Sequence, residues 1–237
     1  MFSMEPCIAV IRITESIDAG WVTSQLSNTE HQQCAQLPES KKNDFIAGRI
    51  ALKRALTRYT STDIREASIQ NTQAGWPIVT GYEHLHCSIS HSHGYGIGIV
   101  APFRVGVDLE QPKSRSPALF SILADADERA LIKTSPAADL DTITALWVMK
   151  EAILKGLGVG LSMSPRRVRM TRVEPSGAFT FSVQDVSPIP WYVWLTKVNN
   201  LLIAVAYEQF LQKQPVIHWH HAPRLPVARA RQNIAAT

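Results

Sequence analysis

Apolar residues recur along the chain at two spacings, and each spacing predicts one type of secondary structure. Residues 44–59, 118–133 and 140–157 carry them every three or four positions, as amphipathic helices do. Gly156 and Gly158 end the last of these segments. Short apolar runs that predict buried strands occupy residues 7–13, 86–90, 95–101, 105–110, 168–173, 178–183, 192–197 and 201–207. This mixture of helices and strands indicates an α+β fold.

A helix followed by a strand–turn–strand unit occurs twice in the sequence. The segment FIAGRIALKRAL precedes CSISHSHGYGIGIVA, and LWVMKEAILKGL precedes YVWLTKVNNLLIAVA. Similar offsets place Arg49 against Lys150 and Arg54 against Lys155. We therefore expect two similar α+β halves, related by a pseudo-twofold axis, with a cleft between them. The predicted boundaries are 1–112 for the N-terminal half, 113–214 for the C-terminal half and 215–237 for a tail.

The net charge of +4 arises mostly in the tail. The chain has 24 Lys and Arg against 20 Asp and Glu, and Arg224, Arg229 and Arg231 stand in the tail without any acid. The rest is nearly neutral, so the charge gives no reason to expect a nucleic-acid partner. The tail is rich in Pro, His and Arg and lacks periodicity, so we expect a loosely attached extension. A hydrophobic content of 45% is that of a folded protein and excludes a disordered chain.

Three cysteines, Cys7, Cys34 and Cys87, stand far apart and without a CxxC spacing. A disulfide framework is therefore not expected, and a reducing compartment is the default. The N-terminal segment MFSMEPCIAVIRI has no basic region and does not read as a signal peptide. The longest apolar runs are far shorter than a bilayer span. These features predict a cytoplasmic protein without a membrane partner.

Two acids, Asp108 and Glu110, alternate at the end of the strand predicted at residues 105–110. Residues i and i+2 of a strand point to the same side, so the two carboxylates project together. Neighbouring carboxylates repel each other unless a cation or a proton lies between them, and an all-oxygen pair suits Mg²⁺. Two solvated acids at the start of a loop are the alternative.

Trp147, Glu151 and Lys155 follow each other at intervals of four residues and share one face of a predicted helix. Lys150 adds a second cation beside the same turn. A solvated Glu–Lys pair, worth a few tenths of a kcal/mol, is the ordinary explanation. A carboxylate flanked by two cations and an aromatic ring also suits a phosphate–metal complex.

Histidines gather in residues 84–94, HLHCSISHSHG. The ligand types of a zinc site are present in His84, His86, Cys87, His91 and His93. The usual CxxC or HxxxH spacing is absent, and on a strand residues 86 and 87 would point to opposite faces. We therefore expect histidines at a strand end and turn. A zinc hydrolase built on this segment would have to contain zinc on metal analysis.

Four segments, in this order, resemble the 4′-phosphopantetheinyl transferase superfamily. They are the FxAGRxAxxxAL-like helix, the sequence SISHS, the sequence VGVDLE and the sequence WxxKEAxxKxxGxGL. The resemblance runs from about residue 45 to 161, half of the chain, and its last two segments are the signature of the family. It points to the longer single-chain type, which activates carrier proteins of fatty-acid, polyketide and nonribosomal-peptide synthesis.

The resemblance implies two similar α+β halves with the active site between them and coenzyme A in the cleft. Asp108, Glu110 and Glu151 match the acids that hold Mg²⁺ on the pyrophosphate of coenzyme A. In the reaction this implies, a serine of an apo acyl or peptidyl carrier protein attacks the β-phosphorus, and 3′,5′-ADP leaves. Glu151 is the candidate to remove the serine proton, and whether it is a base or only a metal ligand stays open.

The resemblance also implies which residues contact coenzyme A. His91 matches a histidine on the 3′-phosphate side, and Ser90 lies next to it. Lys155 matches the lysine that meets the pyrophosphate, where it would stabilise the developing charge. Arg49 and Lys53 would belong to a basic helix that reaches the nucleotide phosphates.

The sequence departs from the family at Trp76, because many members have Gly-Lys-Pro where this chain has Gly-Trp-Pro. Trp76 cannot supply the charge of that lysine, but it could stack on the adenine or simply pack. A degenerate module that binds coenzyme A or a carrier protein without transfer is the alternative to an enzyme. Because one chain carries both halves of the cleft, we expect a monomer.

Overall fold

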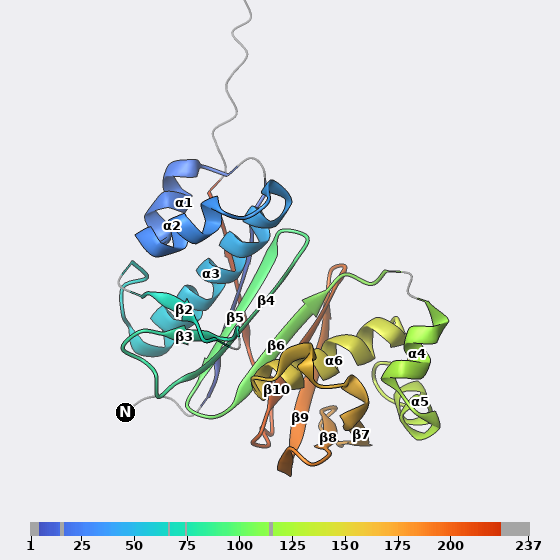
Figure 1. Cartoon of the computed structure of the whole chain (residues 1–237). Helices are drawn as coiled ribbons and strands as arrows, with labels where there is room; N and C mark the ends of the chain where they lie inside the picture. Colours follow the sequence, from blue (N-terminus) through green and yellow to red (C-terminus); the bar gives the residue numbers. More distant parts are fainter. Residues whose placement is uncertain (1–4, 15–16, 66, 74, 114–115, 224–237) are drawn as a thin grey trace, which may run out of the picture.

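A computed structural model describes residues 5–14, 17–65, 67–73, 75–113 and 116–223 of the chain (Figure 1). It contains two larger β-sheets, each with a long helix on one face, and a small two-stranded sheet. This arrangement confirms the predicted α+β fold. Within the described residues, no helix combines the length and the apolar character that crossing a membrane requires.

The first sheet belongs to the N-terminal part of the chain. Its strands are β1 (Cys7–Arg12), β4 (His86–Ser92), β5 (Tyr95–Ala101) and β11 (Ile217–His221), in the order β11-β1-β5-β4. β1 and β4 are antiparallel to β5, whereas β11 runs parallel to β1. The small sheet of β2 (Ile69–Asn71) and β3 (Pro77–Val79) was not predicted.

The second sheet is antiparallel throughout. Its strands are β6 (Val105–Glu110), β7 (Val168–Val173), β8 (Phe179–Val183), β9 (Ser187–Val198) and β10 (Leu201–Tyr207), in the order β6-β10-β9-β8-β7. Their apolar runs are the ones that predicted strands, because strands buried on both faces need few polar positions. β9 is longer than the predicted 192–197, because its first residues, 187–191, extend a hairpin with β8.

The helices are α1 (Ala19–Gln25), α2 (Asn28–Ala35), α3 (Glu39–Thr60), α4 (Pro117–Leu123), α5 (Ala126–Lys133) and α6 (Thr142–Gly156), with short 3₁₀ turns at Gly160–Ser162 and Pro165–Arg167. The single helix predicted at 118–133 is wrong, because Asp125 caps a new helix in its middle. Asp125 and Glu128 form a capping box there, and Ser27 and Glu30 form one at α2. The polar sequence of α1 and α2 gave no periodic signal.

Four layers build the core, in the order α3, first sheet, second sheet and α6. Apolar residues of both sheets, such as Ile99 and Val205, pack against each other in the middle. α3 covers the outer face of the first sheet with residues such as Leu52 and Leu56. α6 covers the outer face of the second sheet through Leu146 and Ile153. Figure 1 shows the two helices on different sheets.

Two buried lysines make the same contacts in the two parts of the chain. Lys53 of α3 has its Nζ 2.7 Å from Glu30 Oε2 and donates to the carbonyl of the last residue of α1. Lys150 of α6 has its Nζ 2.8 Å from Glu128 Oε1 and donates to the carbonyl of the last residue of α4. The repeat expected from the sequence is therefore shifted by one helical turn, because Lys53 and not Arg49 is the counterpart of Lys150.

The strand pairing bears on the predicted domain boundaries. β6 lies before residue 112 but pairs with β10 of the second sheet. The prediction of a loose tail is wrong for Ile217–His221, which pair with β1 through their backbone and need no apolar periodicity to do so. Residues 224–237, which include the tail arginines, lie outside the described residues. We propose to divide the chain between β5 and β6 rather than at residue 112.

Candidate active site

Strands β4 and β6 lie side by side, one at an edge of each sheet. Alternate serines of β4, which we call the serine row (Ser88, Ser90 and Ser92), are buried and face β6. The Ser88 hydroxyl accepts the N–H of Val107 at 3.2 Å, and the Ser90 hydroxyl accepts that of Leu109 at 3.4 Å. Side-chain hydroxyls thus satisfy backbone donors at the place where the two sheets meet.

Asp108 and Glu110 point toward α6, because the alternate residues Val105, Val107 and Leu109 lie in the core between the sheets. This confirms that the two acids share one side of the strand. Gly106 lies on the same side, and a Cβ built there would be 1.8 Å from the backbone oxygen of Ala152. Its missing side chain lets α6 pass directly over β6.

Asp108, Ser90 and Lys155 form one hydrogen-bonded cluster between the two halves. The Lys155 ammonium lies 2.7 Å from Asp108 Oδ1, and the Ser90 hydroxyl donates to the same oxygen at 2.6 Å. Lys155 also donates to Ser90 Oγ at 2.9 Å. Asp108 is 4% exposed, and its second oxygen, Oδ2, is buried without a hydrogen-bond partner among the described residues. An unpartnered buried carboxylate oxygen calls for a cation or a donor.

Glu151 lies next to this cluster and is half-buried. Burial raises its pKa, the Lys155 ammonium lowers it, and the charges of Asp108 and Glu110 raise it further. The net shift of the Glu151 pKa is upward, and burial is its largest cause. Trp147 is half-buried one turn earlier on the same helix face, as the sequence predicts.

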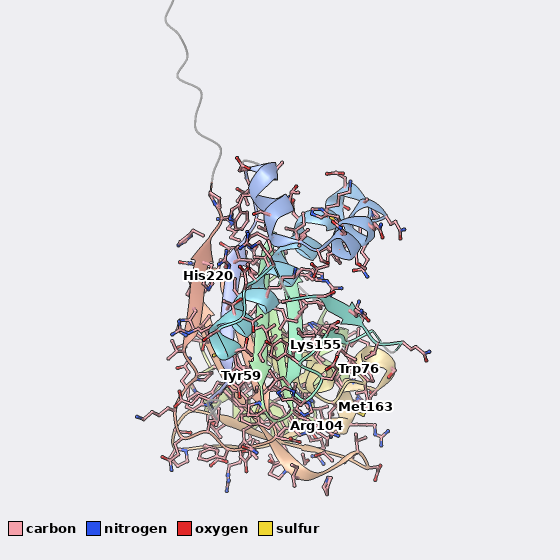
Figure 2. The ribbon with its side chains drawn as sticks, turned by 90° about the vertical axis from the view of Figure 1, so that its left-hand side faces the viewer. Tyr59, Trp76, Arg104, Lys155, Met163 and His220 are labelled. Atoms are coloured by element: carbon pink, nitrogen blue, oxygen red, sulfur yellow. The ribbon has the colours of Figure 1, made fainter. Side chains whose placement is uncertain are left out.

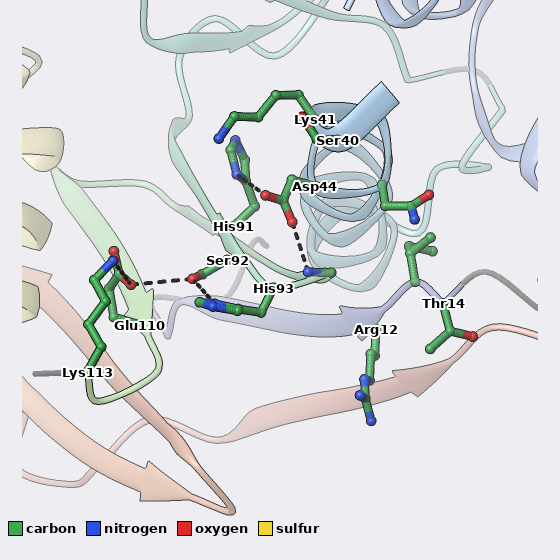
Figure 3. A pocket seen from close by; sticks show the side chains of 13 residues that line it. Arg12, Thr14, Ser40, Lys41, Asp44, His91, Ser92, His93, Glu110 and Lys113 are labelled. Atoms are coloured by element: carbon green, nitrogen blue, oxygen red, sulfur yellow. Dashed lines mark hydrogen bonds and ion pairs between the residues drawn. The ribbon is translucent and has the colours of Figure 1, made fainter. Parts of the chain in front are cut away.

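A polar cleft of about 950 Å³ opens beside the end of the serine row (Figure 3). His91 lies in it with its Nδ1 3.9 Å from Asp44 Oδ2, and partial burial lowers the His91 pKa while Asp44 raises it. Lys41, from the first turn of α3, lines the same cleft. Lys41, from the first part of the chain, and Lys113, from the second, therefore border one space that could hold an anion.

A second hydrogen-bonded chain crosses this cleft. The Ser92 hydroxyl donates to Glu110 Oε2 at 3.3 Å and lies 2.8 Å from His93 Nδ1. Lys113 Nζ is 3.9 Å from the same Glu110 oxygen (Figure 3). Ser90 thus donates a hydrogen bond to Asp108, and Ser92, two residues later, donates one to Glu110. Both acids are held in place by serines of the same row. Ser88 and Ser92 had no role predicted from the sequence. Their alternation with Ile89 and His91 nevertheless indicates that the serines share one face of a strand.

Trp76 lies near Lys155 (Figure 2), and neither of them lines this cleft. Both line smaller pockets of about 280 and 150 Å³. Trp76 is 39% exposed, and a Cβ at Gly158 would lie 3.1 Å from its ring. Gly158 has a φ of +71°, so both its backbone and the indole above it favour glycine.

The structure places three of the basic residues named from the sequence against other protein groups. Lys53 is fully buried in its ion pair with Glu30. Arg49 is 4% exposed, and its guanidinium donates to Ile69 O and Asn71 Oδ1 instead. Lys150, expected to flank Glu151, points away from it and pairs with Glu128. The periodicity of a helix predicts which face a residue occupies only to within about one turn. It also gives no information about the buried glutamates on other helices that pair with these lysines.

The described part of the histidine segment does not bring a set of metal ligands together. Among the described residues, no group of three or more His, Cys, Asp or Glu side chains is gathered closely enough to hold a metal ion. This holds for the histidines and equally for Asp108, Glu110 and Glu151. The latter three still offer only oxygen ligands, and Asp108 Oδ2 lacks a partner. They fit a divalent cation that takes its remaining ligands from phosphate and water.

Two family models match the chain one after the other. The 4′-phosphopantetheinyl transferase N-terminal domain matches residues 29–101, and the 4′-phosphopantetheinyl transferase superfamily matches residues 104–206. The chain belongs to this superfamily. The two matched regions meet between β5 and β6, and the second includes Asp108, Glu110, Glu151 and Lys155.

Curated relatives from bacteria share the superfamily. The chain is 26% identical over 118 residues to the 4′-phosphopantetheinyl transferase psf-1 of Bacillus pumilus, which covers 49% of this chain and 51% of the relative. It is 23% identical to the 4′-phosphopantetheinyl transferase Sfp of Bacillus subtilis, over 70% of this chain and 75% of that protein. The chain thus spans about half the length of the Bacillus pumilus relative, and 55% of enterobactin synthase component D of Salmonella austin.

A solved structure aligns with part of the chain. It is a holo-(acyl-carrier-protein) synthase of Bacillus anthracis in complex with CoA (3′,5′-ADP). The alignment covers 42% of this chain and 96% of that one, with 22% sequence identity and a TM-score of 0.37.

Proposed function

We propose that this superfamily member transfers the 4′-phosphopantetheine group of coenzyme A to a serine of an apo acyl or peptidyl carrier protein. The observation that carries the proposal is the cluster of Asp108, Ser90 and Lys155 between the two halves, with Glu151 beside it. A cation and several carboxylates, held rigidly by serines, suit a reaction in which charge moves between phosphate oxygens.

Mg²⁺ is the metal that this donor set fits best. Asp108 and Glu110 would hold it, with Glu151 as the third acid, and the pyrophosphate of coenzyme A and water would complete its ligands. When bound, the metal neutralises charge on the phosphates. The unpartnered Asp108 Oδ2 supports this assignment.

Coenzyme A would lie across the junction of the two halves. The cleft beside His91 and Lys41 offers cations for the nucleotide phosphates, and it is large enough for a nucleotide. Ser90 and Lys155 would meet the pyrophosphate. With Lys53 and Arg49 buried, the basic contribution from α3 reduces to residues of its first turn, such as Lys41.

In the proposed reaction, the oxygen of the carrier serine forms a bond to the β-phosphorus while the bond from that phosphorus to the oxygen of 3′,5′-ADP breaks. Glu151 accepts the serine proton, directly or through water, and burial raises its pKa toward that of an effective base. Lys155 stabilises the negative charge that 3′,5′-ADP carries away.

The protein would work as a cytoplasmic monomer. Both walls of the junction come from one chain, so a second copy is not needed to complete it. All three cysteines are free, as a reducing compartment would leave them.

Intact mass measurement on a panel of apo carrier proteins tests the proposal. The purified chain, coenzyme A and Mg²⁺ should add one phosphopantetheine to at least one acyl or peptidyl carrier protein, and EDTA should prevent the addition. A carrier protein with its acceptor serine replaced by alanine is the control. If coenzyme A binds but no carrier protein in the panel gains mass, the transfer is contradicted and a degenerate binding module explains the fold.

A further inference from the structure

Lys155 lies on one of the two oxygens that Asp108 offers to a divalent cation. Its ammonium lies 2.7 Å from Asp108 Oδ1, and Ser90 completes a closed triangle with contacts of 2.6 Å to that oxygen and 2.9 Å to the ammonium. The Asp108 side chain is 5% exposed, so little water can compete for this oxygen. The ion pair is therefore a strong, weakly screened contact in the middle of the site.

A metal ion on either oxygen of Asp108, including the unpartnered Oδ2, would lie close to the Lys155 ammonium, and two cations at neighbouring positions repel each other strongly in a partly buried site. The Lys155 side chain is 25% exposed, which leaves it room to turn away from Asp108. It will do so only for a partner that replaces the lost charge pair. A pyrophosphate group is such a partner, since its oxygens bind an ammonium ion and a metal ion at the same time.

We propose that Lys155 makes the site selective for a metal bound together with a pyrophosphate-containing ligand over the free metal ion. The ammonium holds Asp108 until phosphate oxygens draw it away, and the carboxylate then becomes available to the metal. This inference rests on the proposed function only in assigning a metal to Asp108. It adds that Lys155 opposes metal binding in the absence of coenzyme A.

The chain offers a matched control for the charge of Lys155. Lys113 is also a lysine near the acids, but it lies 3.9 Å from Glu110 Oε2 and its side chain is 55% exposed. Replacing either lysine with methionine removes one positive charge and keeps a long side chain. Only Lys155→Met removes the cation that lies on the Asp108 oxygen.

The test measures Mn²⁺ binding to the full chain in the absence of coenzyme A and carrier protein. The electron paramagnetic resonance signal of free Mn²⁺ reports how much metal remains unbound. We expect Lys155→Met to bind Mn²⁺ about 10- to 100-fold more tightly than the unmodified chain, since a competing charge is removed from a partly buried site. Lys113→Met should stay within about threefold, because solvent screens its charge. Adding Asp108→Asn to Lys155→Met should abolish the gain.

Coenzyme A provides a second readout in the same titration. In the unmodified chain it should tighten Mn²⁺ binding strongly, and in Lys155→Met it should do so much less, because no ion pair remains to be broken. Circular dichroism checks the fold, and Lys155→Gln replaces Lys155→Met if that variant unfolds. Equal or weaker Mn²⁺ binding by the lysine variant overturns the proposal, and so does an equal gain from Lys113→Met. Because no carrier protein is used, this outcome is independent of whether transfer is detected.

Discussion

The two halves of the molecule share a scaffold but differ in what they place beneath their long helices. In each half a strand precedes two short helices and a long one, and a hairpin completes the sheet: β1 to β5 in the first half, β6 to β10 in the second. Asp108 pairs with Ala204, the fourth residue of β10, and Ala9 pairs with Gly98, the fourth residue of β5. Ala9 is therefore the counterpart of Asp108.

The other site residues follow the same correspondence. By strand register, Glu110 corresponds to Ile11, a fully buried core residue. By the buried lysines, Glu151 and Lys155 of α6 correspond to Arg54 and Arg58 of α3. The first half thus has an apolar strand under its helix, where the second half has two carboxylates.

This difference follows from the position of each strand in its sheet, because acids are tolerated on an edge strand that has polar neighbours. β1 lies inside its sheet, between β5 and β11, and a charge on it would be buried without a partner. β6 is an edge strand, and the serine row of β4 and the end of α6 supply its acids with hydroxyls and an ammonium. One scaffold therefore carries a core in one half and a site in the other.

The largest effect should come from what the halves share. Lys53→Met and Lys150→Met each leave a buried glutamate without its cation, and each should lower the free energy of unfolding by about 3–5 kcal/mol. Urea unfolding followed by circular dichroism measures this. Lys113→Met, which removes an exposed lysine, is the control. Similar losses in both halves would support the repeat, whereas a loss from only one lysine would break it.

The next effect tests what the halves do not share. Asp108→Ala gives the second half the residue that the first half has at this position. We expect transfer to a carrier protein to fall by about 100-fold or more, because the site loses the carboxylate at its centre. Thermal unfolding should change little, since the freed Lys155 side chain reaches solvent. If a folded Asp108→Ala protein still transferred the group at the original rate, Asp108 would have no role in the reaction.

A pair of glycines separates packing from chemistry. A Cβ at Gly106 would lie 1.8 Å from the Ala152 backbone, and one at Gly98 would lie 2.3 Å from the Leu52 backbone. Gly106→Ala and Gly98→Ala should each cost about 1–3 kcal/mol of stability through overpacking. Only Gly106→Ala should also slow transfer at a temperature where both variants are folded, because it moves α6 relative to β6. Equal activities in the two variants would contradict this.

The smallest effect concerns the strand that covers β1. Burial, and next the neighbouring arginines Arg54 and Arg58, lower the pKa of His220, and burial and Arg58 lower that of His218. A histidine whose pKa is lowered by folding contributes its full stabilisation at pH values above the usual histidine pKa, near 6.5. This stabilisation is lost as the pH falls toward the lowered pKa.

Hydrogen exchange of β11 measured at pH 7.5 and pH 5.5, corrected for the intrinsic pH dependence of exchange, checks this expectation. The amides of β11 should open more at the lower pH, while the amides of β6, which face the serine row, should not. His220→Gln should reduce the difference. Equal changes in both strands would show a global loss of stability instead of a local one.

Sequence patterns were sufficient for the elements whose burial is continuous or periodic. The strands from β4 to β10 and the helices α3 and α6 all carry such patterns, because one face or both faces must avoid water. The alternation of Asp108 and Glu110, and the spacing of Glu151 and Lys155, likewise follow from the geometry of one strand and one helix. Those four residues could be assigned to a common site through the family signature without any coordinates.

The partners of each charged side chain and of each strand edge could be identified only from the three-dimensional structure. A lysine on a helix reads the same in sequence whether it meets Glu30 in the core, as Lys53 does, or Asp108 in the site, as Lys155 does. β11 pairs with β1 through backbone groups that every residue carries, so its sequence holds no sign of that partner. Local spacing fixes the direction in which a side chain points, but the groups it meets come from distant segments brought there by packing.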